Sequence, residues 1–370
     1  MGDDSSEASD GPRWASELLR VDALSPTELT DAEARASRAA ETRAGDDPER
    51  RWALALAGLC ALRRFDDATG QARLEAALAA ARRAEDDALA AHILYRLPYS
   101  YYRVGAFDRC FERAGEALEL ARARGDELRR GKALHDIGVS QHELGDYQEA
   151  LDALLASLGA FEGLGHPQIA IALNGIGLCY RTMGQLELAL EYFERSLALR
   201  SGEGNAYGQG ICLINLSRCH ALSGDARAAA VQARASLARF EALGDPVMGG
   251  YARIHLADAL ELAGESDEAR ALYALNLADA RLQGTDLEPA STFGLGRLEA
   301  RLGDGFALGR LEQALALAEA QGLKPMVADV HLELSKLREA QGDPGGALSH
   351  FKHYHALQAR SCASATANAW

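Results

Sequence analysis

The chain has 370 residues, of which 48% are hydrophobic and 25% charged, and its formal net charge is −15. This composition is typical of a soluble helical protein, and no apolar run is long enough to span a bilayer. The acidic balance argues against sequence-independent binding of nucleic acid by the whole chain. The amino terminus is acidic and has no signal-peptide core, so the sequence predicts a cytoplasmic protein.

The amino-terminal segment differs from the rest of the chain. The first 50 residues contain thirteen acidic residues and six arginines. Residues 1–13 are predicted to be a disordered acidic tail, because they are polar and charged and show no apolar periodicity. Residues 14–49 are predicted to form short helices that cap the region that follows. The expected helix starts are Ser25-Pro26-Thr27-Glu28 and Thr30-Asp31-Ala32-Glu33.

From about residue 50 onward, glycines recur at near-constant spacing. One series has intervals of 39 or 40 residues, and a second series lies between its members. An aliphatic residue precedes each glycine of the first series by eight positions, and a small residue usually follows that aliphatic. Such a period is typical of a solenoid, in which each unit buries its apolar face against its neighbours. The first series is Gly105, Gly145, Gly184, Gly224, Gly264, Gly303 and Gly342; the second is Gly125, Gly165, Gly204, Gly244, Gly284 and Gly322.

Each unit is predicted to be a helix, a tight turn and a second helix. Apolar residues recur at helical spacing, and no stretch shows sustained strand-like alternation. Glycine permits the positive φ of a helix stop, and small residues such as Gly138 and Gly177 let helices approach closely. The predicted fold is an all-α, right-handed α-solenoid of seven or eight repeats over residues 50–358, followed by a tail at 359–370.

Two units depart from this pattern. The first, from about residue 51 to residue 87, is degenerate, because Phe65 stands where the other units have glycine. In the next unit Pro98 replaces the small residue after the aliphatic Leu97.

One stretch carries a family resemblance. Residues 174–180, followed by Gly184, Ala189, Tyr192 and Phe193, resemble the tetratricopeptide repeat. The longer period is similar to that of bacterial regulatory and peptide-sensing repeat proteins, and the resemblance covers residues 50 to 357. It implies a concave groove, lined by the first helix of each unit, that binds a peptide or a segment of a partner protein.

The resemblance places ligand contacts at the residue before each aliphatic and one turn to either side. These residues vary between units while the packing positions stay constant. Basic and aromatic residues dominate the amino-terminal half, which favours an acidic peptide or a terminal carboxylate. The alternative is that these charges are only solvated or paired with one another. The predicted binding residues are Arg96, Tyr99, Arg103, Lys132, Arg181, Asn215, Arg218, Tyr251 and His255, with Asn215 expected to bind the peptide backbone.

The sequence contains no catalytic signature of the common hydrolase, zinc-protease or kinase types, and its glycine-rich stretches lack the Lys-Ser/Thr of a phosphate loop. The six cysteines form no CxxC pair and are expected to be small buried residues. Cys212, Cys219 and His220 form one candidate metal set, and His350, His353 and His355 another; each lacks the further ligands that a site needs. The sequence therefore predicts no enzyme, no metal and no cofactor.

The preferred function is a non-catalytic protein-interaction scaffold or adaptor in bacterial regulation or signalling, with a peptide or protein as partner and neither nucleic acid nor membrane. The alternative is a sensory module that responds to a peptide or another ligand. Residues 347–358 resemble the last helix of bacterial sensor repeats, so this module would be detached from, or truncated before, an output domain such as a cyclase or kinase. The oligomeric state stays open.

Overall fold

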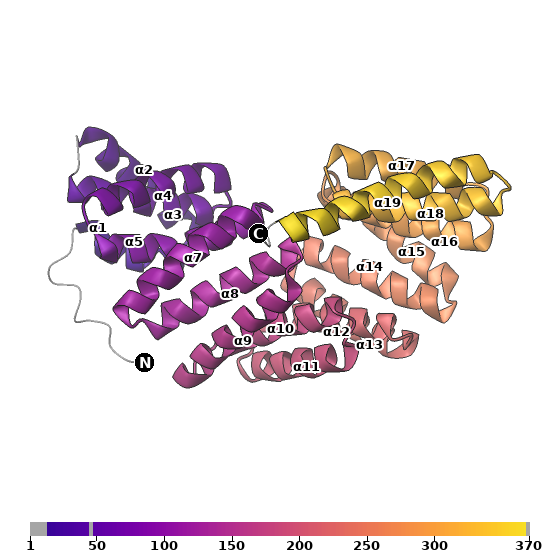
Figure 1. Ribbon diagram of the computed structural model, residues 1–370, viewed down its shortest axis with the longest axis horizontal. Helices are drawn as coiled ribbons and strands as arrows, with labels where there is room; N and C mark the ends of the chain where they lie inside the picture. The colour runs from indigo at the N-terminus through magenta and orange to yellow at the C-terminus, as the bar shows by residue number, and fades with distance from the viewer. Residues whose placement is uncertain (1–12, 44–46, 368–370) are drawn as a thin grey trace. The chain divides into compact units, whose positions relative to one another are not determined.

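The computed structural model of the chain describes residues 13–43 and 47–367. In these residues every long element is an α-helix, no strand occurs, and eight helix-turn-helix pairs follow one another (Figure 1). The predicted all-α repeat fold is thereby confirmed. Within the same ranges, no helix has both the length and the apolar character needed to cross a membrane. The tail predicted for residues 1–13 lies outside the described residues, apart from Arg13.

The chain divides into two compact units, Met1–Pro167 and Gln168–Trp370, which we describe separately. Unit 1 begins with an amino-terminal segment and continues with three helix pairs, the second of which has a broken first helix. Its elements are α1 (Arg13–Leu19), η1 (Val21–Ala23), α2 (Pro26–Thr42), α3 (Pro48–Arg63), α4 (Asp67–Arg83), α5 (Asp87–Leu94), α6 (Leu97–Arg103), α7 (Phe107–Arg124), α8 (Glu127–Leu144) and α9 (Tyr147–Leu164).

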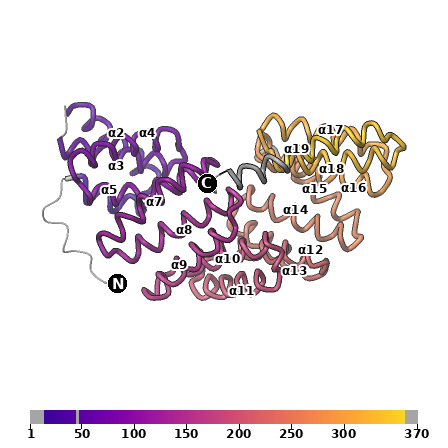
Figure 2. Tube along the Cα trace, viewed as in Figure 1, coloured from indigo at the N-terminus to yellow at the C-terminus, as the bar shows by residue number. Residues whose placement is uncertain are grey.

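Unit 2 contains five helix pairs, and its trace runs back and forth from one helix to the next (Figure 2). The first helices of these pairs have even numbers, from α10 to α18, and each contacts the next first helix along the unit. Its elements are α10 (Ile169–Thr182), α11 (Leu186–Gly202), α12 (Ala206–Leu222), α13 (Ala226–Leu243), α14 (Pro246–Ala263), α15 (Ser266–Ala278), η2 (Ala280–Leu282), α16 (Leu287–Leu302), α17 (Ala307–Ala320), α18 (Lys324–Ala340) and α19 (Pro344–Ala367).

The amino-terminal segment packs on the first helix pair. Trp14 and Leu18 of α1 are buried in the same core cluster as Trp52 of α3. The helix start predicted at Ser25 is correct, since Ser25 and Glu28 form a capping box at the start of α2. The start predicted at residue 30 is wrong, because that residue lies inside α2. The first start supplies a complete cap and leaves no break for a second one.

The turns depend on a left-handed backbone. All thirteen glycines of the two predicted series have positive φ, between 59° and 97°. In the degenerate first unit the same positions hold Phe65 and Glu85, with φ of 63° and 55°. The turn geometry is therefore retained where glycine is absent, and these two side chains carry the strain that glycine avoids.

Two element boundaries follow from local chemistry. The first helix that contains Pro98 is broken into α5 and α6, because proline lacks the N–H that would continue the helix. Helix α19 continues to Ala367, beyond the boundary predicted at residue 358. Residues 347–367 contain neither glycine nor proline, so no residue of the kind that usually ends a helix stops it there.

The two helices of a pair approach closely at the small residue after the aliphatic. A Cβ atom on Gly138 would lie 2.6 Å from Leu154 Cγ and 3.0 Å from the carbonyl oxygen of Ala150. At the equivalent position in another pair, the Ser217 hydroxyl donates to the carbonyl oxygen of Ala229 at 2.9 Å. The position thus takes glycine, the small Ala257, or a serine whose hydroxyl bonds to the facing backbone.

A second contact joins the helices of three consecutive pairs at their other end. The Ser157 hydroxyl of α9 donates to the carbonyl oxygen of Gly131 in α8 at 2.7 Å. Ser196 of α11 makes the same bond to Ala170 of α10 at 2.7 Å, and Ser236 of α13 bonds to Gly210 of α12 at 2.9 Å. Because these side chains are buried, each bond also fixes the register of its pair.

We predict that replacing Gly177 with leucine lowers the free energy of unfolding by about 1–3 kcal/mol, because the new side chain overpacks the crossing. A Cβ atom there would already lie 2.7 Å from Phe193 Cε1. Chemical denaturation measures the change. Gly159 of α9 is the matched control, since a Cβ atom there meets nothing within 4 Å. Gly159→Ala should stabilise by about 0.5–1 kcal/mol; a Gly177→Leu variant as stable as the native protein would contradict the close crossing.

Candidate functional site

The nine predicted binding residues fall on both units. Arg96, Tyr99, Arg103 and Lys132 lie on α6, its preceding turn and α8 of unit 1. The other five lie on the first helices of unit 2: Arg181 on α10, Asn215 and Arg218 on α12, and Tyr251 and His255 on α14.

The cations of unit 1 are paired within the unit. Arg96 bonds to Asp22 of η1, and Arg103 bonds to Asp67 of α4. The Lys132 ammonium lies 2.5 Å from both carboxylate oxygens of Asp136, which is buried. The charges of these three cations are thus offset by neighbouring carboxylates, which is the alternative that the sequence left open for them.

The remaining feature of unit 1 is aromatic. Tyr99 is 49% exposed, and its ring stacks on Tyr102 with a centroid distance of 6.1 Å. The Lys132 ammonium lies 5.7 Å from the Tyr99 ring centroid. A cavity between α5, α7 and α8 is lined by alanine and leucine side chains together with Tyr95, Arg124, Arg129, Lys132 and Asp136. Its volume of about 10 Å³ is room for about one water molecule.

In unit 2, polar side chains form a continuous row along the first helices. The Asn215 side chain is 6% exposed, and its amide donates to Asn174 Oδ1 at 3.0 Å. Arg181 Nη1 donates to Asn215 Oδ1 at 3.1 Å. We call the following residues the first-helix surface of unit 2: Asn174, Arg181, Asn215, Arg218, His255, Asp258, Arg297, Asp329, Glu333 and Lys336.

Arg218 and His255 lie next in this row. The Arg218 side chain reaches solvent and makes no hydrogen bond or ion pair among the described residues, yet the protein atoms around it lower the pKa of its guanidinium through burial. Burial also lowers the pKa of His255 to about 4; Asp258 opposes this effect, and the charges of Arg218 and Arg181 add to it. At neutral pH, His255 is therefore an uncharged imidazole beside two arginines.

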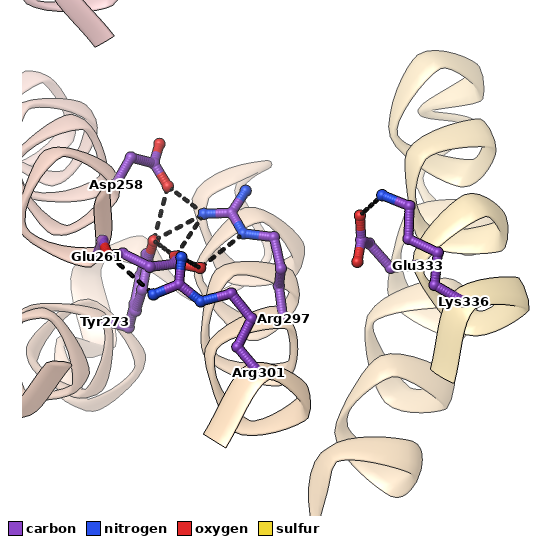
Figure 3. A network of polar contacts seen from close by, with 7 residues as sticks. All are labelled: Asp258, Glu261, Tyr273, Arg297, Arg301, Glu333 and Lys336. Carbon is purple, nitrogen blue, oxygen red and sulfur yellow. Dashed lines mark hydrogen bonds and ion pairs between the residues drawn. The ribbon is translucent and has the colours of Figure 1, made fainter. Parts of the chain in front are cut away.

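A compact ion-pair network follows on α14, α15 and α16 (Figure 3). Arg297 Nη2 lies 2.6 Å from Asp258 Oδ1 and 2.7 Å from Glu261 Oε2. Glu261 is only 4% exposed, and its Oε1 also forms an ion pair with Arg301 Nη1 at 3.5 Å. The Tyr273 hydroxyl donates to Asp258 at 2.7 Å. The network joins consecutive repeats, and its positive and negative side chains offset one another.

Tyr251 also joins consecutive first helices. Its hydroxyl donates to Asp286 at the start of α16. Burial and this hydrogen bond raise the pKa of the hydroxyl above its usual value. Tyr251 thus has a structural partner at the position where the sequence predicts a ligand contact.

The row ends on α18. Lys336 Nζ lies 2.6 Å from Glu333 Oε1, so these two charges form a pair. Asp329 is exposed and makes no hydrogen bond or ion pair with any described residue. Burial, together with the charge of Glu333, raises the pKa of its carboxyl group.

The predicted list omitted three polar residues that help to form this surface: Asn174, Arg297 and Asp329. A strict count of the repeat assigns Gly175 to the slot of Asn215, whereas the hydrogen bond of Asn215 reaches Asn174. Arg297 and Asp329 lie at counted groove positions, and their mixed charge gave no reason to choose them from sequence.

We predict that Arg297→Gln destabilises unit 2 by about 2–3 kcal/mol, because it leaves the buried Glu261 carboxylate without its main counter-charge. Lys336→Gln is the control, since the exposed pair that it breaks contributes about 0–1 kcal/mol. Urea unfolding compares the two variants. Equal stabilities would mean that the network around Arg297 contributes no more than a solvated surface pair.

The described cysteines are all buried, as the sequence predicts. Among the residues that the structure describes, no group of three or more His, Cys, Asp or Glu side chains is arranged to hold a metal ion. The histidines of α19 instead meet a buried histidine of α18. His331 Nδ1 lies 2.9 Å from His350 Nδ1, and the His331 ring stacks on His353 with a centroid distance of 4.9 Å.

This histidine cluster predicts acid sensitivity. Burial, together with the charges of His350 and His353, lowers the pKa of His331 to about 4. The folded protein then binds fewer protons than the unfolded chain between about pH 6.5 and pH 4. The contribution of His331 to the free energy of unfolding is therefore complete above pH 6.5, and it is lost as the pH falls from about 6.5 to about 4.

The expected result is faster amide exchange in α19 at pH 4.5 than at pH 7, after correction for intrinsic exchange. In the His331→Gln variant this pH dependence should be smaller. The Arg338, Glu312 and Asp343 charges act on His350 in the same cluster and are unchanged in the variant. If the pH dependence of amide exchange in His331→Gln is unaltered, the acid sensitivity of α19 comes from Arg338, Glu312 and Asp343 and not from His331.

Comparison with known proteins gives the class of fold. Residues 168–242 match the family model of the tetratricopeptide repeat. No curated protein matches the sequence of the chain. A Rap protein complexed with competence and sporulation factor has a TM-score of 0.71 at 13% identity, with 95% of this chain and 97% of that chain covered.

Two further solved structures are similar. The apo form of the quorum sensor NprR from B. thuringiensis has a TM-score of 0.69 at 14% identity, covering 93% of this chain and 96% of that chain. The Rap conjugation gene regulator of plasmid pLS20, in complex with the Phr* peptide, has a TM-score of 0.62 at 14% identity, covering 94% and 93%. The chain therefore has the long-repeat tetratricopeptide fold of these bacterial regulators, as the sequence resemblance predicts.

Proposed function

We propose that the protein is a non-catalytic, cytoplasmic interaction scaffold in bacterial regulation, and that it binds a peptide or a partner segment on the first-helix surface of unit 2. The observation that carries this proposal is the row formed by Asn174, Asn215 and Arg181, next to Arg218. Hydrogen bonds hold the two amides in place, and Arg218 has no carboxylate partner among the described residues. Amides can bond to an extended backbone, and arginines to acidic groups.

Support for this proposal comes from the contrast between the two units. In unit 1 the cations are already paired with carboxylates, so a ligand would have to break those pairs. In unit 2, Arg218 forms no ion pair with a described residue. The similar Rap regulator of pLS20 was solved with a peptide, which makes a peptide the first class of ligand to test.

The double variant Arg181→Ala/Arg218→Ala tests the proposal. We expect it to weaken capture of the partner from a lysate of the source organism and to flatten the salt dependence of binding, because charge-assisted contacts contribute about 1.5–3 kcal/mol each. Arg227 is the matched control: it is exposed on α13, and no hydrogen bond or ion pair links it to a described residue. Undiminished binding by the double variant would place recognition elsewhere on the chain.

A second candidate is a peptide-responsive sensor. The likeness in fold to the quorum sensor NprR favours it. Small-angle scattering separates the two functions: a change in radius of gyration on addition of the ligand supports the sensor, and binding without such a change supports the scaffold.

A further inference from the structure

Two charged side chains on the first-helix surface of unit 2 form no ion pair with a described residue. Arg218 lies on α12 and Asp329 on α18, and within residues 13–43 and 47–367 neither makes a hydrogen bond or an ion pair. Burial shifts the pKa of Arg218 down and that of Asp329 up. In both cases burial outweighs the opposite charges nearby, Asp258 for Arg218 and Arg297 with Lys336 for Asp329, so the protein disfavours the charged form.

The other charged residues of this surface on α14, α16 and α18 form ion pairs with one another. Arg297 pairs with Asp258 at 2.6 Å and with Glu261 at 2.7 Å. On α18, Lys336 pairs with Glu333 at 2.6 Å, as Figure 3 shows. On α12 the first-helix surface thus has a positive group without an ion pair, Arg218, and on α18 a negative group without one, Asp329. The charged residues of this surface on α14 and α16 between them are paired.

A partly desolvated charge without a partner costs free energy, and a ligand of opposite charge recovers it. We propose that the first-helix surface of unit 2 binds a dipolar peptide whose acidic group meets Arg218 and whose basic group meets Asp329. This inference rests on the proposed function and adds the charge pattern of the ligand. A carboxylate can accept hydrogen bonds from the Arg218 guanidinium, and an ammonium or guanidinium can donate to the Asp329 carboxylate.

The helix order also sets the spacing of the two ligand charges. Helices α14 and α16 lie between α12 and α18, and each first helix contacts the next. Packed helices are about 8–10 Å apart, so three steps span roughly 24–30 Å. An extended peptide advances about 3.3 Å per residue, which places its two charges roughly seven to nine residues apart. The residues between them need no net charge, because they face His255 and the Arg297 network.

A peptide library provides the test. The probes are nonapeptides with blocked termini and uncharged, randomised central positions. Their end residues are Glu and Lys in either order, two Glu, two Lys, or two uncharged residues. We expect one of the two dipolar classes to be enriched about tenfold or more over the uncharged class on the immobilised protein. Equal recovery of dipolar and uncharged peptides would overturn the inference and leave peptide binding standing; recovery of no class above background would contradict the proposed function itself.

Two neutral variants assign each end. Arg218→Gln should abolish the preference for the acidic end only, and Asp329→Asn the preference for the basic end only. Arg227→Gln on α13 is the control with the same loss of charge and should keep both preferences. An unchanged preference in Arg218→Gln and Asp329→Asn would overturn the assignment of the two ends.

A second measurement needs no ligand. Because Arg218 and Asp329 have no partner to lose, Arg218→Gln and Asp329→Asn should leave the melting temperature unchanged or raise it. Arg297→Gln, which breaks two ion pairs of the same surface, should lower it. A fall in melting temperature for Arg218→Gln and Asp329→Asn that equals the fall for Arg297→Gln would show that both charges are already compensated in the free protein.

Discussion

The close crossing of the two helices in each repeat is the constraint on which the rest of the structure depends. At this crossing stands glycine, as in Gly138 and Gly177, the small Ala257, or a serine that bonds to the opposite backbone, as in Ser217. Because the second helix packs so tightly against one side of the first, other sides of each first helix are left to contact the neighbouring first helices along the unit. The polar row of unit 2 lies on these first helices.

This constraint explains why the fold could be predicted from sequence. Small residues at the crossing and glycines in the turns are each set by backbone geometry, so they repeat wherever the geometry repeats. The period even located the degenerate unit, where Phe65 adopts the left-handed conformation of the missing glycine. The second helix start proposed near residue 30 failed because capping patterns also occur by chance inside a helix.

The site could be predicted only in part. The repeat places Arg96 and Arg103 on first-helix segments, but it does not reveal their counter-charges. Asp22 lies 74 residues before Arg96 in the chain, and Asp67 lies 36 residues before Arg103. Such pairs depend on which side chains meet in space. A basic residue in the sequence therefore becomes a binding candidate only after its neighbours are known, which is why Arg218 stands apart from the cations of unit 1.

Charge compensation is thus the feature that separates structural from binding residues on this scaffold. Arg297 and Tyr251 connect consecutive repeats, because the guanidinium pairs with Glu261 and the hydroxyl donates to Asp286. Arg218 and Asp329 form no ion pair or hydrogen bond with a described residue. Removing the first kind should weaken the fold, and removing the second kind should weaken only recognition.

The central claim, that ligands bind to the first helices of unit 2, is tested most directly by photo-crosslinking. A photoreactive phenylalanine analogue is placed either at Ile171 on α10 or at Val231 on α13, which are 41% and 57% exposed. In a lysate of the source organism, the account predicts a crosslinked partner from position 171 and none from position 231. A partner captured from position 231 alone would contradict the account and place binding on the second helices.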